Sequence, residues 1–249
     1  MQYGITHLSI VPLRLDPNDT SEMTSQILYG DFFKVLEVRK KWSKIRLAFD
    51  NYEGWVDNKQ YLEITEEDYN QLTSENLKVT CNLIEHVTTV NDYLSLIPLG
   101  ANLNGLEILK HQFEGDFITN KQPKDDIVKT AFMYMNAPYL WGGKTPFGID
   151  CSGFTQMVYK INGYAILRDA SQQATQGEAL SFIEESEPGD LAFFDNNEGN
   201  IVHVGIIMKD NYIIHAHGEV RIDRLDHTGI FNVQRNAHTH KLRVIKRII

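Results

Sequence analysis

The chain has 249 residues, of which 42% are hydrophobic and 23% charged, a composition typical of a globular protein with room for two or three compact units. Its 33 acidic and 24 basic side chains give a formal charge of -9, and no cluster of basic and aromatic residues indicates a nucleic-acid groove. No stretch is apolar for long enough to span a bilayer, and the first residues lack the basic and apolar regions of a signal peptide. The sequence therefore predicts a cytoplasmic protein, or a periplasmic or secreted one if a leader precedes these residues.

Short β-strands separated by turns are predicted across the first 64 residues. Residues 8–14, 32–38, 42–48 and 52–56 alternate between apolar and polar side chains, the period of a half-buried strand. Several short strands in so small a segment favour a small, half-open barrel, with its tryptophans supplying core area.

A polar segment at residues 66–70 is predicted to be a linker or a helical turn. A second, shorter β-rich unit is expected from about residue 77 to residue 117, with its clearest strands at residues 78–84 and 94–100. Cys81 lies in an alternating run without a charged neighbour, so we expect it to be buried and unreactive.

The remainder of the chain, from Pro123, predicts an α+β arrangement. Helical periodicity covers residues 125–135, with acidic residues at the start, where the helix dipole favours them. A second helix is expected from Cys151, and residues 168–173 lead into a short third one. Three β runs follow, at residues 190–194, 201–208 and 212–216.

Cys151 follows a turn rich in glycine and proline, and it is predicted to occupy the first turn of its helix. Free backbone N–H groups and the helix dipole favour a nucleophilic thiolate there. His203 and His215 each occur in an apolar strand, where an imidazole needs a hydrogen-bond partner. The pattern predicts that His203 faces Cys151 and that His215 holds the other ring nitrogen. A zinc site formed by these three residues is the competing interpretation, but the chemistry requires no metal and no cofactor.

Four ordered motifs, at residues 138–153, 187–194, 203–206 and 214–216, resemble the NlpC/P60 family of papain-like cysteine peptidases. Residues 26–31, 41–45 and 54–56 resemble parts of a bacterial SH3-like domain, and both β-rich units together resemble those of γ-D-glutamyl-L-diamino acid endopeptidases. The expected fold is α+β. A papain-like catalytic domain over residues 121–249 is preceded by an SH3-like barrel at residues 1–66 and a reduced one at residues 67–120.

The resemblance implies a role for each matching residue. Cys151 matches the nucleophile, His203 the general base and acid, and His215 the residue that orients the base. Tyr139 matches a tyrosine whose hydroxyl stabilises the oxyanion together with the backbone N–H of Cys151.

The resemblance also implies a pocket for the free α-amine and the D-glutamyl carboxylate of a substrate. Asp150 and Asp169 can pair with the ammonium group, and Ser152 or Arg168 can donate a hydrogen bond to the carboxylate. Glu22 and Tyr52 of the first SH3-like unit close the pocket, or else Glu22 is a solvated residue and Tyr52 belongs to a turn. Trp141 either forms a wall of the pocket or packs beside Gly142 and Gly143. Ala170 stands where relatives often carry a hydroxyl, and His217 and His227 are expected at the surface. The substrate-binding residues so predicted are Asp150, Ser152, Asp169, Trp141, Arg168, Tyr52 and Glu22.

The implied activity is that of a cysteine endopeptidase that hydrolyses the bond between γ-D-Glu and an L-diamino acid. Its partner would be a murein peptide with a free N-terminal L-Ala, in cell-wall recycling or degradation. A non-catalytic cell-wall peptide-binding module is one alternative, and an amidase or acyltransferase on the same fold is another. No nucleic acid or membrane span is expected, while the diamino acid and the oligomeric state are left open.

Overall fold

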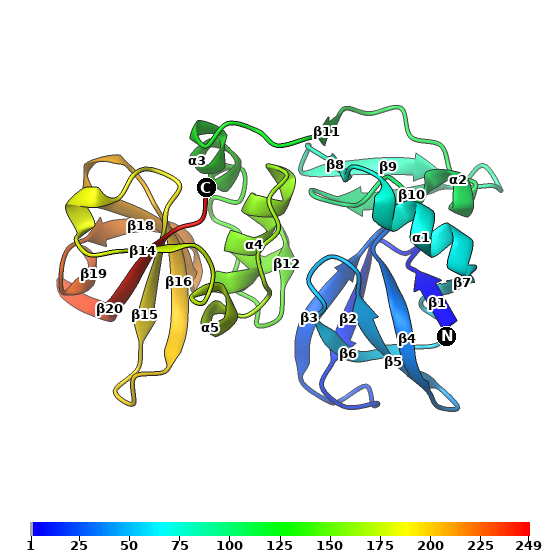
Figure 1. Cartoon of the computed structure of the whole chain (residues 1–249), viewed down its shortest axis with the longest axis horizontal. Helices are drawn as coiled ribbons and strands as arrows, with labels where there is room; N and C mark the ends of the chain where they lie inside the picture. Colours follow the sequence, from blue (N-terminus) through cyan, green and yellow to red (C-terminus); the bar gives the residue numbers. More distant parts are fainter. Residues whose placement is uncertain (1) are drawn as a thin grey trace. The chain divides into compact units, whose positions relative to one another are not determined.

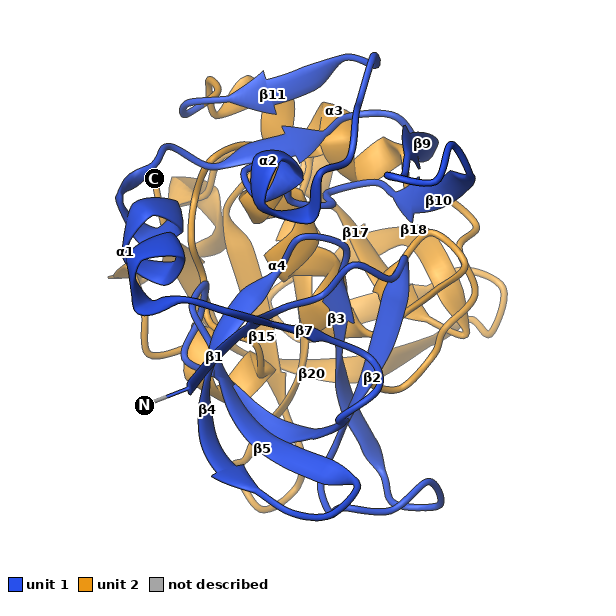
Figure 2. Ribbon diagram, turned by 90° about the vertical axis from the view of Figure 1, so that its right-hand side faces the viewer, with its two compact units in different colours: residues 1–121 blue, residues 122–249 orange. Residues whose placement is uncertain are grey.

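The computed structural model describes residues 2–249 (Figure 1). The chain divides into two compact units, residues 1–121 and residues 122–249, which Figure 2 shows in different colours. Over the described residues, no helix combines the length and the apolar character needed to cross a bilayer.

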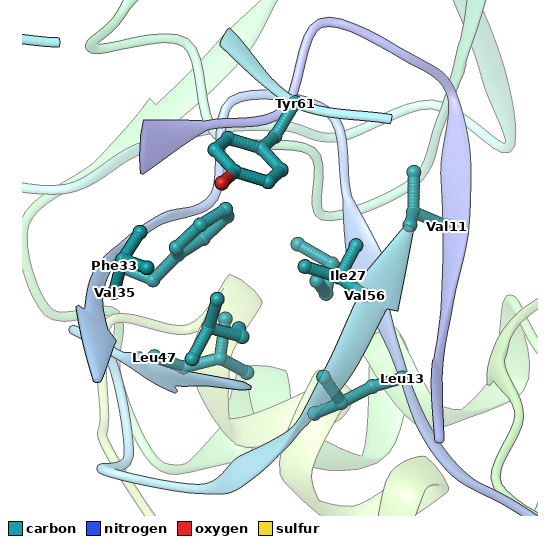
Figure 3. Close-up of a cluster of buried hydrophobic side chains, with 9 residues drawn as sticks. Val11, Leu13, Ile27, Phe33, Val35, Leu47, Val56 and Tyr61 are labelled. Atoms are coloured by element: carbon teal, nitrogen blue, oxygen red, sulfur yellow. The ribbon is translucent and has the colours of Figure 1, made fainter. Parts of the chain in front are cut away.

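The first unit contains a seven-stranded antiparallel sheet in the order β3-β2-β6-β5-β4-β1-β7. Inward side chains alternate with outward ones along its strands and meet in a common core, most of which Figure 3 labels. That core consists of Val11, Leu13, Ile27, Phe33, Val35, Ile45, Leu47, Val56 and Tyr61. The strands are β1 (Gln2–Ile5), β2 (Ile10–Arg14), β3 (Met23–Leu28), β4 (Phe32–Val38), β5 (Trp42–Leu47), β6 (Glu53–Asp57) and β7 (Leu62–Ile64).

The rest of the first unit begins with helix α1 (Glu66–Ser74). Thr65 caps this helix: its hydroxyl accepts a hydrogen bond from the backbone N–H of Asp68, whose carboxylate accepts one from the backbone N–H of Thr65. Two separate two-stranded sheets follow, one of β9 with β10 and one of β8 with β11. Their bounds and that of a short helix are β8 (Lys78–Thr80), β9 (Ile84–Thr88), β10 (Leu94–Pro98), α2 (Leu106–Leu109) and β11 (Phe117–Thr119).

This segment shares a hydrophobic core with the first sheet. Val87 and Ile97 from the paired strands pack in one cluster with Ile5 of β1 and with Tyr29, which follows β3. A second barrel over residues 67–120 is therefore not confirmed. Cys81 is half-buried rather than buried, because it lies just beyond the end of β8.

The second unit consists of helices that precede a seven-stranded sheet in the order β14-β20-β15-β16-β17-β18-β19. Strand β19 also pairs with β20, so strands β15 to β20 form a closed ring of neighbours, a small barrel. The elements are α3 (Asp125–Phe132), β12 (Lys144–Thr145), β13 (Gly148–Ile149), α4 (Cys151–Ile161), α5 (Ala170–Gln173), β14 (Glu178–Leu180), η1 (Ile183–Glu185), β15 (Leu191–Asp195), β16 (Ile201–Ile207), η2 (Lys209–Asn211), β17 (Tyr212–His217), β18 (Glu219–Leu225), β19 (Gly229–Asn232) and β20 (Ala237–Arg247).

The interior of this barrel has an apolar part and a polar part. Ile213 of β17, Leu225 of β18 and Ile245 of β20 belong to one buried cluster, although β17 and β20 are not neighbours in the ring. Histidines from β16, β17 and β20 also contact one another, and strands that do not pair can bring side chains together only across the interior. The barrel therefore encloses a histidine-rich region beside its hydrophobic core.

Candidate active site

Cys151 is the first residue of α4, and the residue before it fixes the turn that leads into the helix. The carboxylate of Asp150 caps α4 by accepting a hydrogen bond from the backbone N–H of Gly153 at 2.6 Å. It also accepts from the backbone N–H of Gly142 at 2.8 Å and from both terminal nitrogens of Arg168, at 2.6 and 3.0 Å. Because Arg168 is only 1% exposed, this is a buried bidentate ion pair that holds the start of the helix.

Glycines make room for this turn. A Cβ atom on Gly143 would lie 2.4 Å from the carbonyl oxygen of Gly148, and one on Gly153 would lie 2.3 Å from the carbonyl oxygen of Gly143. Real Cβ atoms do not approach backbone so closely, so larger residues would displace the segment that carries Cys151. The two glycines are therefore required by packing.

The thiol of Cys151 is buried, and burial decides its ionisation. Burial raises the pKa of Cys151 to about 12, and the carboxylate of Asp150 acts in the same direction. Backbone N–H groups of Val204 and Ser152, together with the Arg168 guanidinium, oppose this rise without overcoming it. The sequence predicted a thiolate from the helix start alone, but burial outweighs that effect and favours the thiol.

The contact with Val204 places Cys151 against β16, next to the strand residue His203. The ring of His203 is 5% exposed, and its Nε2 lies 2.8 Å from Nδ1 of His215 on the neighbouring strand β17. The Nε2 of His215 in turn lies 3.1 Å from a carboxylate oxygen of Asp223 on β18. A continuous hydrogen-bonded chain thus runs through the barrel from His203 to Asp223.

Asp223 determines which nitrogen carries the proton in each ring. An ionised carboxylate only accepts hydrogen bonds, so Nε2 of His215 carries a proton and its Nδ1 accepts one from Nε2 of His203. The Nδ1 of His203 is then left with a lone pair. The chain therefore leaves His203 in the tautomer that can accept a proton at Nδ1.

Ionisation states agree with this assignment. Burial is the main reason why the pKa values of His203 and His215 are lowered, so both rings are neutral near pH 7. Burial opposes ionisation of Asp223, but hydrogen bonds from His215 and Arg221 outweigh it and hold the pKa of Asp223 below its usual value. Asn232 adds two further contacts to this carboxylate, at 3.2 and 3.3 Å.

Two more histidines lie beside this chain. His217, which was expected at the surface, is half-buried, and its ring centroid lies 6.2 Å from that of His215. That expectation was wrong because alternation along β17 turns His217 to the same face as His215. His240 of β20 stacks on His203 with ring centroids 4.2 Å apart. In contrast, His227 is exposed, as expected, with Glu184 as its partner.

Tyr139 is another predicted site residue near the thiol. Burial raises the pKa of its hydroxyl to about 12, and Cys151 and Asp150 contribute to the rise, so the phenol lies within electrostatic range of Cys151. Its backbone also pairs with Ile149 in a parallel bridge. Through that bridge, the tyrosine is fixed to the segment that enters α4.

The other predicted substrate-binding residues have varied surroundings. Ser152 accepts a hydrogen bond from Arg168 at 3.0 Å, so these two side chains and Asp150 form one buried cluster. Asp169 is half-buried at the start of α5, and the side chain of Trp141 is 59% exposed.

The remaining two belong to the first unit. Glu22 is exposed immediately before β3, and Tyr52 packs against the core of the first sheet, just before β6. Their contact with a substrate stays a prediction.

Sequence reasoning missed Asp223, Asn232 and His240. Asp223 occurs in residues 219–225, where polar side chains conceal the alternation of the strand, so no local signal indicated a buried carboxylate. No local pattern indicates Asn232 or His240, because only closure of the barrel brings β19 and β20 to the site.

Comparison with known proteins adds to this geometry. Residues 136–238 match the NlpC/P60 family, and residues 13–60 match the bacterial dipeptidyl-peptidase SH3 domain. The chain is 30% identical over 213 residues to the gamma-D-glutamyl-L-lysine dipeptidyl-peptidase of Bacillus subtilis strain 168, an alignment that covers 77% of this chain and 71% of the relative. It is 28% identical over 253 residues to dipeptidyl-peptidase 6 of Lysinibacillus sphaericus, covering 86% and 88% of the two chains.

A solved structure also matches along the entire fold. The crystal structure of an NlpC/P60 family protein from Bacillus cereus has a TM-score of 0.80, with 99% of both chains covered at 19% identity. Here the likeness is one of fold. The matched domains and the relative from Bacillus subtilis show that this chain belongs to the NlpC/P60 family of cysteine peptidases and carries an SH3 domain of the bacterial dipeptidyl-peptidase type.

Proposed function

We propose that this peptidase hydrolyses the bond between γ-D-Glu and an L-diamino acid in murein peptides that have a free N-terminal L-Ala. The observation that carries the proposal is the buried chain His203–His215–Asp223 beside the thiol of Cys151. The names of relatives support the choice of bond, since one of them is a gamma-D-glutamyl-L-lysine dipeptidyl-peptidase.

Acylation follows from the neutral thiol and imidazole. Nδ1 of His203 takes the proton of Cys151 as the sulfur attacks the γ-carbonyl carbon of D-Glu, so a C–S bond forms and the carbonyl oxygen becomes an oxyanion. The backbone N–H of Cys151 and the hydroxyl of Tyr139 stabilise that oxygen. The imidazolium then gives its proton to the amine of the diamino acid as the C–N bond breaks, leaving a thioester.

Deacylation reverses the proton flow. His203 takes a proton from a water molecule that attacks the thioester, and the C–S bond breaks to regenerate the thiol of Cys151. The products are the diamino acid with whatever follows it and L-Ala-γ-D-Glu. His215, held by Asp223, keeps His203 in the same tautomer for both steps.

Specificity for a free amine rests on acidic groups. Asp169 is the proposed partner of the substrate ammonium, and Glu22 and Tyr52 are proposed as further substrate contacts. Asp150, Ser152 and Arg168 already hydrogen-bond one another, so we assign them mainly to shaping the pocket. Trp141 is proposed as a wall.

The proposal extends to residues 67–120 and to the cellular role of the protein. We propose that residues 67–120 are a reduced SH3-like domain. A role in cell-wall recycling or degradation fits the proposed bond, and a cytoplasmic location stays a prediction.

Peptide cleavage tests the proposal directly. The purified protein is incubated with L-Ala-γ-D-Glu-L-Lys, with the diaminopimelate analogue, and with the N-acetylated form of each, and the products are separated by chromatography. We expect release of L-Ala-γ-D-Glu only from peptides with a free amine. Equal rates on the acetylated peptides would contradict amine recognition, and cleavage at another bond would contradict the assigned bond.

The two cysteines provide a matched pair of variants. Cys151→Ala should abolish turnover because no nucleophile remains, while Cys81→Ala should leave it unchanged because this thiol has no part in the proposed chemistry. Turnover that survives in Cys151→Ala would exclude Cys151 as the nucleophile.

A further inference from the structure

The ring of His203 has one neighbour that the proposed chemistry leaves unused. His240 of β20 stacks on it with centroids 4.2 Å apart and planes 24° from parallel. Phe194 of β15, the strand between them, lies against both rings with centroid distances of 5.7 and 5.9 Å. His217 meets the edge of His240 at 4.8 Å. His203 is thus enclosed by rings from three other strands.

Two β-bulges aim the stacked rings at each other. In β20, Ile230 pairs with His240 and Phe231 with His238, so Thr239 is an extra residue. In β16, an equivalent shift leaves Val202 as the extra residue just before His203. A bulge changes the face to which the following side chains point, and bulges are common beside active sites. His240 pairs with Ile230 of the buried cluster, so its ring faces the interior, while His238 before the bulge is exposed.

The second ring is itself held in place. The hydroxyl of Thr239, the bulged residue, lies 2.9 Å from Nδ1 of His240. Burial is the main cause that lowers the pKa of His240 to about 4, and His215 and His217 add to this effect. Arg235 acts in the same direction and Asp223 opposes it. His240 is therefore neutral near pH 7 and places no like charge beside His203 when that ring takes a proton.

A single hydrogen bond does not fix the plane of an imidazole. His203 is bound through Nε2 to His215 at 2.8 Å, and its ring could still rotate about the Cβ–Cγ bond by as much as this hydrogen bond tolerates. Such a rotation would change the direction of Nδ1, the nitrogen proposed to take the proton of Cys151. A flat ring packed on the face of His203 removes this freedom, whereas an aliphatic side chain of similar volume would fill the space without defining the plane.

We propose that His240 is a positioning residue that holds the plane of His203 so that its Nδ1 stays directed at Cys151. The inference rests on the proposed role of His203 as the base. It does not depend on the identity of the peptide that is cleaved.

The test compares His240→Phe, which keeps a flat ring, with His240→Leu, which keeps bulk without a plane. His238→Leu is the matched control, because His238 lies on the same strand but is exposed and paired with Asp226. Each folded protein is treated with iodoacetamide near pH 7, and mass spectrometry of the digested peptides gives separate alkylation rates for Cys151 and Cys81. Thermal unfolding is recorded for all three variants.

We expect His240→Leu to lower the alkylation rate of Cys151 about tenfold, since small misplacements of a reacting group cost this much or more. His240→Phe should stay within about threefold of wild type, and His238→Leu and the rate at Cys81 should not change. With a cleavable peptide, His240→Leu should lower kcat by a similar factor and leave KM nearly unchanged.

Equal alkylation rates of Cys151 in the Phe and Leu variants would overturn the inference. Failure of the proposed function would appear differently. Wild-type protein would then leave γ-D-glutamyl peptides intact. The alkylation rate of Cys151 would still be lower in a His203→Ala variant than in wild type.

Discussion

Replacing Asp223 with asparagine should exchange donor and acceptor in each hydrogen bond of the buried chain His203–His215–Asp223. The carboxylate accepts hydrogen bonds from Nε2 of His215 at 3.1 Å, from Arg221 at 2.9 and 3.2 Å, and from the amide of Asn232. Nε2 of His215 and Nε of Arg221 bond the same carboxylate oxygen. Where the NH2 group of an asparagine takes the place of that oxygen, the bond from Nε of Arg221 is lost and the NH2 group faces His215 as a donor, while the remaining oxygen accepts from the other Arg221 nitrogen and from Asn232. Nε2 of His215 then accepts, its Nδ1 becomes the donor, and Nδ1 of His203 acquires the proton. No lone pair is left for the thiol of Cys151.

The magnitude follows from comparable chemistry. In a Ser–His–Asp triad, the corresponding change lowers kcat about 10⁴-fold because the base is held in the wrong tautomer. Here the carboxylate acts through one additional ring, so we expect kcat of Asp223→Asn to fall about 10²- to 10³-fold, or about 3–4 kcal/mol. KM should change little, because Asp223 is 4% exposed inside the barrel.

Steady-state kinetics on L-Ala-γ-D-Glu-L-Lys, together with thermal unfolding, measure this effect. Asp226→Asn is the matched control: Asp226 follows β18 and bonds to His238 at 2.8 Å, its side chain is 51% exposed, and it is outside the buried chain. A folded Asp223→Asn variant whose kcat is within about threefold of wild type would refute the tautomer argument.

Three further outcomes are expected. Gly205→Ala should lower both kcat and the melting temperature, because its Cβ would lie 2.9 Å from the Cβ of His215; unchanged kinetics would show that the barrel relaxes without moving that ring. Asp150→Ala should lower the free energy of unfolding by about 3–5 kcal/mol in urea titrations, since the buried Arg168 loses its carboxylate and α4 its cap, and a loss below about 1 kcal/mol would contradict this. The free energy of unfolding should fall as pH drops from about 6.5 towards 4, because the unfolded chain binds protons on histidines that stay neutral when folded; each contributes up to about 1.4 kcal/mol per pH unit. In urea titrations, the free energy of unfolding should differ less between pH 7 and pH 5 for His240→Phe than for wild type. An equal difference would count against a neutral His240.

Local patterns were sufficient for the elements whose residues carry a clear period. Alternation predicted strands at residues 32–38 and 42–48, and the structure has β4 and β5 there. A turn rich in glycine and proline, followed by a run without helix breakers, predicted the helix that begins at Cys151. Such signals lie within a few residues of one another, so they do not depend on the rest of the fold.

Strands with mixed side chains were not predicted. Residues 219–225, 229–232 and 237–247 form β18, β19 and β20, but their polar residues conceal the alternation because one face lines a partly polar interior. The bulge at Thr239 shifts the period further. Without β20, neither closure of the barrel nor the position of His240 could be inferred.

The sequence by itself determined the family and the candidate nucleophile, because Cys151 and the motifs around it are contiguous. It also indicated the pair His203 and His215, since each interrupts an apolar strand. Only the tertiary structure decided the protonation of this site. Burial reverses the preference that a helix start gives to a thiolate, and Asp223, from a strand that only the folded barrel brings next to His215, fixes the tautomers. Both effects depend on solvent exclusion and on contacts across the barrel, which no local pattern of residues contains.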